Sequence, residues 1–482
     1  MSNFYQISLC DVYDEFSTFM TDNSSSYFEL FRNYISFSEI IPYSFYGAYY
    51  QNMGRDRDFS LEAMLMFFIY KNFRSISRDI TLLRILNDSP DLRHSLGFNE
   101  LPHPSQISRF KTIFLDQIHL TLDHLVSIVN DELETIIPDA SKILIADTTG
   151  FEAYVTENNP KFFEGLLQTA KNYAKSKHAP KNFNPVKYAH GKMPKAAHVN
   201  KDITLAYLNG HFDYYLKAMI LTNGAGVVQD IQFPDAIQEF YDNKMPETVK
   251  DEYDSKTLIP SLEFFFTKHP YNHLNFLLAD SGFDGYDNYK YISKKDIVPI
   301  IPLNKRTGNL KANSYRYSKN NEDNDFFFNP QGNLICRKTN LAMNPLGFIN
   351  STNRANRFSY GCPLIKTHML NGKIVYATKC KNPCSNAVYG RKVNIAIDED
   401  YRFNSSYSRD SEQWINLYKK RTVCERAIGQ LKDLMNIKGS QIRNTKSLKS
   451  VVLLAGITQL IGVLLMVRSN HLKHIRAFKS IS

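Results

Sequence analysis

Five residues in the C-terminal part of the chain combine a carboxylate, two cationic groups and two aromatic rings at helical spacing. Residues 411–435 have the periodicity of one long helix and contain no proline. On such a helix, one stripe within about 40° of Glu425 carries Trp414, Tyr418, Arg421 and Lys432. A carboxylate can hold a cation while its neighbours bind phosphate and stack on a base. The stripe predicts a pocket for a DNA end, and the alternative is a surface helix with ordinary pairs such as Arg421–Glu425.

Two aspartates further upstream follow short apolar runs. Residues 142–147 predict a buried strand that ends at Asp147, and residues 274–279 predict another that ends just before Asp280. Taken singly, each aspartate would more often be a turn or cap residue. Together with Glu425 they supply three carboxylates from separate parts of the chain, which are natural ligands for Mg²⁺.

The residues around these strands predict the other elements of a sheet. A hairpin is expected from strands at 203–210 and 214–223, with its turn at 210–213. A helix at 255–268, a helix at 286–294 and a strand at 296–304 complete the series. The sequence therefore predicts an α/β fold.

Four residues of the C-terminal stripe also reproduce a known spacing. They are Tyr418, Arg421, Glu425 and Lys432. Their separations resemble the Y-(2)-R-(3)-E-(6)-K motif of bacterial insertion-sequence transposases of the DDE class. The order of strands and helices is likewise similar to the RNase H-like core of that class. The resemblance implies that Asp147, Asp280 and Glu425 are its catalytic triad.

The same resemblance implies two Mg²⁺ ions about 3.5–4 Å apart, which Mn²⁺ can replace. Asp147 would be the shared ligand, Asp280 a ligand of one ion and Glu425 a ligand of the other. Asp284 and Asp287 lie close to Asp280 in sequence. They are either supporting groups or surface turn residues.

The motif residues would contact the DNA itself. Arg421 and Lys432 would hold phosphates near the cleaved bond, and Tyr418 would contact the terminal nucleotide. Trp414, the one tryptophan of the chain, lies on the same helical face by periodicity. It would hold a flipped base, and core packing is the alternative.

Residues 1–138 predict a helical N-terminal domain, with helices at 61–73 and 76–87. Pro104 is expected to end one element and Ser105 to cap the next helix. That helix carries Arg109 and is expected either to read DNA or to be a plain amphipathic helix.

Composition fits a polyanionic partner. The chain has 482 residues, a formal net charge of +10 and 13% aromatic residues, and its length suits two or three domains. The N-terminus lacks the pattern of a secretory signal, so a cytoplasmic protein is expected. The apolar run at 451–468 is expected to be a core helix rather than a membrane span, because it is short and contains polar residues.

A second domain boundary lies inside the α/β region. Residues 139–304 and 411–482 are expected to form the core, and residues 305–410 an insertion too long to be a simple loop. Four of the six cysteines lie in this insertion: Cys336, Cys362, Cys380 and Cys384. They predict a zinc site that would stabilise the insertion, and buried free thiols are the alternative.

These observations predict a transposase that binds the ends of an insertion sequence and catalyses metal-dependent strand cleavage and strand transfer. Its expected partners are double-stranded DNA, as element end and as target, and a second copy of the chain. No membrane partner is expected, and the protein would be cytoplasmic and associated with the nucleoid. The alternatives are a domesticated or inactive relative that binds DNA without cutting it, and another nuclease of the RNase H-like fold.

Overall fold

The structure, a computed structural model, describes residues 31–470 with gaps, together with residue 472. The gaps are 52–55, 177–179, 181, 209–210, 236, 238–253, 270–272, 305–314, 317–325, 330, 351, 353–354, 382, 400, 403–406 and 435. The predictions for residues 1–30, for the first turn residue of the hairpin at Gly210 and for several parts of the insertion therefore lie outside the described residues.

Helices alone precede the first strand in the part of the chain that the structure describes. They include α3 (Phe37–Ile40), α4 (Tyr43–Tyr49), α5 (Leu61–Phe73), α6 (Asp79–Asp88), α7 (Pro90–Ser95), α8 (Pro104–Ile113), α9 (Leu115–Ile136) and α10 (Pro138–Ser141). Helix α5 has the predicted bounds, and α6 begins three residues later than predicted.

The start of α8 differs from the prediction. Pro104 is the first residue of the helix rather than the end of an earlier element. The cap is His103, whose Nδ1 accepts a hydrogen bond from the Ser105 N–H at 3.2 Å, while the Gln106 side chain accepts from the His103 N–H at 2.7 Å. Proline suits the first helical position because its missing N–H would have no partner there.

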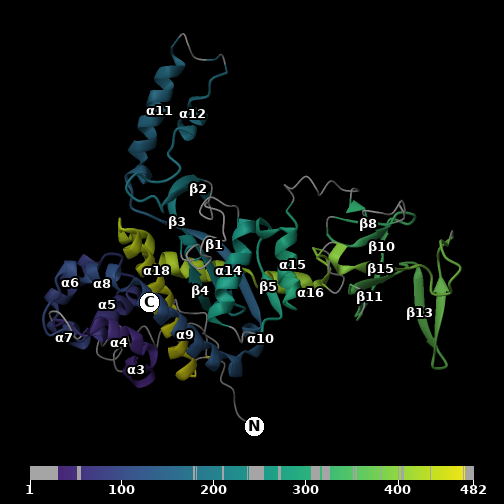
Figure 1. Ribbon diagram of the computed structural model, residues 1–482, viewed down its shortest axis with the longest axis horizontal. Helices are drawn as coiled ribbons and strands as arrows, with labels where there is room; N and C mark the ends of the chain where they lie inside the picture. Colours follow the sequence, from purple (N-terminus) through teal and green to yellow (C-terminus); the bar gives the residue numbers. More distant parts are fainter. Residues whose placement is uncertain are drawn as a thin grey trace, which may run out of the picture.

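Six strands form the main sheet (Figure 1). They are β1 (Ile143–Glu152), β2 (Thr204–Leu208), β3 (His211–Asn223), β4 (Val228–Gln232), β5 (Phe276–Leu278) and β6 (Val298–Ile300). The order is β2-β3-β1-β5-β6, and β4 also pairs with β3. Strands β1 and β3 are antiparallel, whereas β1, β5 and β6 are mutually parallel. The predicted α/β class and the predicted hairpin are confirmed, although 211–213 belong to β3.

Strand β1 is longer than predicted. It continues five residues beyond Asp147, because Thr148–Glu152 pair with Met219–Tyr215 of β3. Asp147 therefore lies in the middle of a strand and not at its end. The polar residues Thr148 and Thr149 concealed this continuation.

Strand β4 was not predicted. All five of its residues are buried although three of them are polar, namely Gln229, Asp230 and Gln232. Asp230 and Gln232 are hydrogen-bonded within the core, so their burial is compensated. The earlier expectation of three strands before the helix at 255–268 is corrected to four.

Helices cover both faces of the sheet. Along β1, Leu144 and Ala146 contribute to one apolar cluster, which includes α14 (Asp254–Lys268) and α15 (Tyr286–Lys294). The alternate residue Ile145 contributes to the other cluster, which includes α9 and α18 (Thr445–Arg468). This alternation is the two-residue period of a strand that is buried on both faces.

Helix α18 is long and apolar enough to cross a membrane, but 94% of its most apolar window is buried inside the molecule. It lies against α9, α5 and α8. Its polar groups are also paired, since Asn72 of α5 donates hydrogen bonds to Leu454 O and Thr458 Oγ1. The expectation of a core helix is confirmed.

Two segments project from this body (Figure 1). The first follows β1 and contains α11 (Pro160–Ala174) and α12 (Pro185–Gly191). The second is the expected insertion, whose described strands are β7 (Tyr315–Arg316), β8 (Phe326–Phe328), β9 (Leu334–Cys336), β10 (Leu341–Ala342), β11 (Asn344–Ile349), β12 (Arg357–Gly361), β13 (Ile365–Leu370), β14 (Lys373–Thr378) and β15 (Lys392–Ala396). They form three small sheets, and two of these, β10-β9-β8-β7 and β11-β12-β15, contribute residues to a separate apolar cluster.

The single helix predicted at 411–435 is divided in the structure. It consists of α16 (Glu412–Lys419), α17 (Thr422–Gly429) and a π-helical turn (Gln430–Leu434). At the break, the N–H groups of Lys420 and Arg421 donate to carbonyls three residues back, at 3.0 and 2.9 Å. The prediction of one continuous helix is therefore wrong. The predicted stripe of residues around Glu425 does not lie on one helical face along its whole length.

Candidate active site

Asp147 lies within β1, and Asp280 follows the end of the neighbouring parallel strand β5 at the matching position. Ile145 of β1 pairs with Leu278 of β5, and each aspartate lies two residues beyond that pair. Because neighbouring strands are about 4.8 Å apart, the two side chains emerge close together. Ile145 belongs to the face covered by α18, so Asp147, two residues on, points toward that same face.

Helix α17 crosses this face and brings Glu425 to the aspartates. Cys424 is fully buried, and its Sγ lies 4.0 Å from the carbonyl oxygen of Ile220, the residue paired with Asp147. Gly226 permits the close approach, because it has a φ of +80° and an added Cβ would lie 3.0 Å from Val423 O. The helix is thus fixed against β3, and the side chain of its next residue is held near Asp147.

Arg421 joins two of the three carboxylates. Its guanidinium donates to Asp147 Oδ2 at 3.3 Å and to Glu425 Oε1 at 2.5 Å. The side chain of Asp147 is 16% exposed and that of Glu425 is 50% exposed, so the group lies at the edge of a partly closed surface. Asp280 also accepts a hydrogen bond, from the Gly282 N–H at 2.8 Å.

The electrostatics of Asp147 show how strongly the carboxylates interact. Burial raises its pKa to about 6, the Arg421 guanidinium opposes the rise, and the carboxylates of Asp280 and Glu425 add to it. One arginine therefore does not compensate the negative charge of this group. A site of this kind favours binding of additional cations, and its carboxylate oxygens suit hard divalent ions.

Two parts of the chain match families of known activity. Residues 243–457, which include Asp280 and Glu425, match the family described as "Transposase DDE domain". Residues 19–112 match the family described as "Transposase domain (DUF772)". The chain belongs to the insertion-sequence transposases of the DDE class. No curated protein matches it.

The DDE domain implies that this transposase uses divalent metal ions. The three carboxylates fit that requirement. They supply oxygen ligands from separate parts of the chain, and their combined negative charge is not compensated by Arg421. Asp284 and Asp287 take other positions. Asp284 accepts a hydrogen bond from the Asn304 N–H at 2.7 Å, and Asp287 is exposed in the first turn of α15.

The aromatic members of the motif lie next to the triad of this transposase. Tyr418 stacks on Trp414, with ring centroids 4.9 Å apart, and Arg421 lies 5.9 Å from the Tyr418 ring. Burial raises the pKa of Tyr418, so the phenol stays protonated as a hydrogen-bond donor. Trp414 is 8% exposed and belongs to the main apolar cluster. Its contacts are those of a core residue supporting Tyr418.

Lys432 and Arg109 lie elsewhere on the transposase. The Lys432 Nζ lies 5.5 Å from the ring centre of Phe151, near the end of β1, because the π-helical turn changes the direction of the residues that follow α17. Arg109 is exposed on α8, where it lines a hollow together with Arg57 and Asp58. DNA binding by both residues stays a prediction.

The four cysteines of the insertion come near one another. Cys336 ends β9, whereas Cys362 and Cys380 follow the ends of β12 and β14. Burial raises the pKa of Cys362, its sulfur accepts a hydrogen bond from the Leu364 N–H, and the thiols of Cys384, Cys380 and Cys336 raise its pKa further. All four are free thiols. The zinc site therefore stays a prediction.

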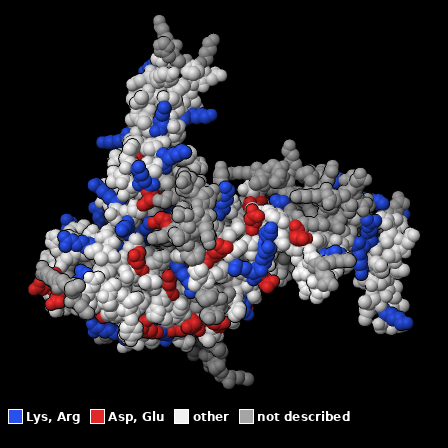
Figure 2. Space-filling view, in the orientation of Figure 1, with Lys and Arg blue, Asp and Glu red and all other residues white. Residues whose placement is uncertain are grey.

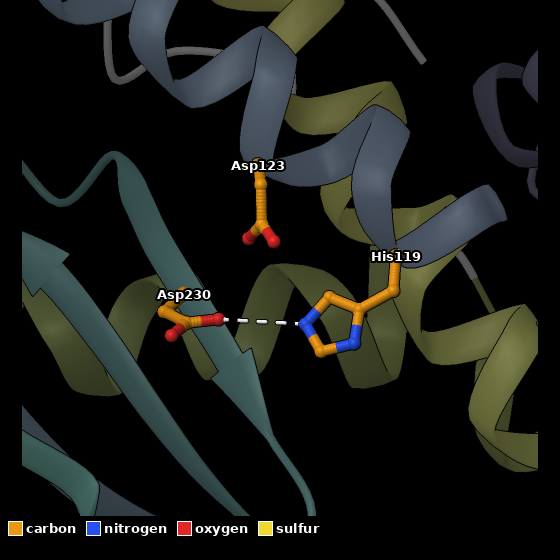
Figure 3. A group of neighbouring side chains, drawn as sticks. All are labelled: His119, Asp123 and Asp230. Atoms are coloured by element: carbon orange, nitrogen blue, oxygen red, sulfur yellow. Dashed lines mark ion pairs between the residues drawn. The ribbon is translucent and has the colours of Figure 1, made fainter. Parts of the chain in front are cut away.

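A different cluster was missed by sequence reasoning. Among the described residues, one group of potential metal ligands has its ligand atoms within 4.8 Å of one another: His119 and Asp123 of α9 and Asp230 of β4 (Figure 3). The Lys268 ammonium lies 3.0 Å from His119 Nε2, 3.0 Å from Asp123 and 3.1 Å from Asp230. A protein cation already fills the centre of this group, which makes it an ion-pair network that joins α9, α14 and β4.

Proposed function

We propose that this transposase binds the ends of its own DNA element and cuts them in a metal-dependent reaction at Asp147, Asp280 and Glu425. One observation carries the proposal: three distant parts of the chain bring carboxylates close enough to interact. The Arg421 guanidinium bridges Asp147 and Glu425, and the carboxylates of Asp280 and Glu425 add to the rise that burial causes in the pKa of Asp147. A further support is the strand order. The row β4-β3-β1 is antiparallel and continues into the parallel strands β5 and β6, as in an RNase H-like core.

The carboxylates would hold two Mg²⁺ ions, or Mn²⁺ in their place. When bound, these ions make an attacking hydroxyl group available at neutral pH and neutralise charge on the leaving oxygen. Asp147 is suited to the shared position because it interacts with both other carboxylates, Asp280 just after β5 and Glu425 on α17.

Arg421 is proposed to take two roles in turn. In the metal-free protein its guanidinium pairs with Asp147 and Glu425. Once cations bind these carboxylates, the guanidinium can pair with a DNA phosphate, for which its planar array of donors is suited. Tyr418, held by its stack on Trp414, would orient the terminal nucleotide beside it.

The remaining parts of the proposal concern partners and location. Two chains would act on two element ends, target DNA would be a second substrate, and the protein would act in the cytoplasm at the nucleoid. A relative that binds DNA without cutting it has no need for three ionised carboxylates in one site. The cluster at Asp147 therefore favours the active enzyme.

The test is strand cleavage of a DNA duplex that carries the flanks of the gene, in Mg²⁺ and in Mn²⁺. We expect the native protein to cut at one position at each end, and Asp280→Ala to bind the same duplex without cutting it. Asp131→Ala, an exposed aspartate on α9, is the matched control and should cut normally. Binding without cutting by the native protein would favour the non-catalytic alternative, and cutting without preference for the ends would favour another nuclease.

A further inference from the structure

The projecting segment after β1 carries most of the net charge of the chain. Residues 160–201, here called the lysine arm, contain nine lysines, no arginine and one acidic residue, Glu164. Their net charge is +8, while the whole chain carries +10. The other 440 residues are thus almost neutral. The predicted polyanion partner therefore has one preferred place on the molecule.

The lysine arm contributes few residues to the hydrophobic core. In α11 one residue is buried, Ala170, and in α12 one residue is buried, Ala189. Ring contacts hold the two helices together instead: Tyr173 stacks on Tyr188 at 5.9 Å and meets Phe183 edge-on at 5.1 Å. Figure 1 shows the arm standing away from the sheet. A segment that contributes so little to the core needs another reason to keep a defined shape.

The lysines of the arm are available to a ligand. Seven of the nine lie in the described residues and are exposed: Lys161, Lys171, Lys175, Lys187, Lys192, Lys195 and Lys201. Within the described part of the chain, none of these seven forms an ion pair with a carboxylate. Figure 2 shows lysine and arginine side chains along the described part of the arm. Their mutual repulsion is uncompensated in the free protein and would be relieved by a polyanion.

The dimensions of the arm fit a DNA duplex. Helix α11 has 15 residues and is therefore about 22 Å long. Its two lysines, Lys161 and Lys171, and the C-cap residue Lys175 fall within about 80° of one another around the helix axis. A duplex carries one negative charge per about 1.7 Å of its axis, so such a stripe can follow its phosphates over several base pairs.

The position of the arm indicates which part of the DNA it would contact. Glu152, at the end of β1, lies five residues after Asp147, a distance of about 17 Å along the strand. The arm begins eight residues later, at Pro160. It would meet DNA about five or more base pairs from the bond at the active site, since each base pair rises about 3.4 Å.

We propose that the lysine arm is a DNA-backbone clamp, which binds the phosphates of double-stranded DNA beside the cleavage site without reading sequence. This inference rests on the proposed function for its choice of DNA as the polyanion. The arm would hold the element end in register while the Tyr418 and Arg421 side chains contact its terminus.

The test measures the affinity of the full chain for a duplex of the element end as a function of salt, by fluorescence anisotropy. The variant is Lys171→Gln with Lys175→Gln and Lys187→Gln. Three lost phosphate contacts should lower the slope of log K against log salt by about 2.7, and should weaken binding roughly tenfold to a hundredfold at 0.15 M salt. An unchanged thermal melting curve shows that the variant is folded.

The control carries the same three changes outside the arm, at the exposed lysines Lys142, Lys294 and Lys338, and should keep the native slope. A variant expected to raise the DNA affinity instead is Glu164→Gln, which removes the one acidic side chain of the arm. It should bind the duplex several-fold more tightly, because one repulsive charge is lost.

Equal slopes for the native protein and the arm variant would overturn the clamp, even if the native protein cuts its ends normally. Tighter arm-dependent binding of single-stranded RNA than of duplex DNA would overturn it as well. A native protein that binds the duplex through the arm but never cuts it would refute the proposed function and leave the clamp standing.

Discussion

Replacing Asp147 by asparagine is expected to stabilise the metal-free protein at neutral pH. The folded protein holds this carboxyl at a pKa of about 6, against a usual value of 3.8, because burial and two neighbouring carboxylates outweigh the guanidinium of Arg421. Each pH unit is worth about 1.4 kcal/mol, so keeping Asp147 ionised at pH 7 costs on the order of 3 kcal/mol. Asparagine keeps the shape of the side chain and removes that cost.

The effect has a defined pH dependence. Below pH 3.8 the carboxyl is protonated in the folded and unfolded states alike, so it has no effect on the free energy of unfolding. Between pH 3.8 and about 6 the folded state binds more protons, and its stability falls as the pH rises. Above pH 6 the full cost applies. The advantage of Asp147→Asn should therefore grow from near zero at pH 4 to its full value at pH 7.

Urea denaturation in the presence of EDTA, at several pH values, measures this difference. Asp131→Asn is the control, since it removes an exposed carboxylate on α9 and should not change stability by more than about 0.5 kcal/mol. Adding Mg²⁺ should stabilise the native protein and not Asp147→Asn, because the ion binds the carboxylate that causes the cost. An Asp147→Asn protein that is no more stable than the native one at pH 7.5 in EDTA would refute the reasoning.

Three further changes test other parts of the structure. Glu425→Gln should abolish metal-dependent cleavage while end binding stays within about threefold, as measured by cleavage and anisotropy on the same duplex. Lys268→Met should lower the free energy of unfolding by about 3 kcal/mol in urea titrations, since it removes the ammonium group that pairs with the buried carboxylate of Asp230. The purified protein should contain one zinc ion per chain by mass spectrometry of its metals, and Cys362→Ser with Cys384→Ser should lose it.

Matched variants separate these effects from general damage. Lys338→Met removes an exposed lysine and should leave unfolding unchanged, so an equal loss there would contradict the role of Lys268. Cys424→Ser changes a buried thiol outside the insertion and should keep any zinc. Metal-free native protein would show that the insertion cysteines are only free thiols, of which Cys336 alone is buried.

The sequence predicted the aspartates of the site because each follows a run of buried apolar residues. Such runs are visible without a structure, since strands covered on both faces are apolar throughout. Strand β4 was invisible for the opposite reason. Its buried Gln229, Asp230 and Gln232 depend on partners far along the chain, such as Lys268 of α14. A local sequence pattern cannot predict a hydrogen-bond or ion-pair partner that is distant in the sequence and close only in the folded protein.

The break before α17 was equally hidden. Residues 420–422 contain neither proline nor glycine, so local propensity predicts a continuous helix. In the structure the Thr422 hydroxyl donates to Lys419 O at 3.0 Å, and Arg421 reaches Asp147 on another element. Tertiary contacts decide the conformation here. The spacing of the motif residues could be read from the sequence, but the directions in which their side chains point could not be predicted from it.

The pairing of α9 with α18 has a consequence for how the protein is made. The apolar face of α9, with Leu122, Leu125 and Val129, is covered by a helix that begins at Thr445. At about 5–20 residues per second, the ribosome needs roughly 15–60 s to reach α18 after finishing α9. During that interval the nascent chain exposes a strip that later becomes its core. Newly made protein is therefore expected to be most prone to aggregation until α18 has been synthesised.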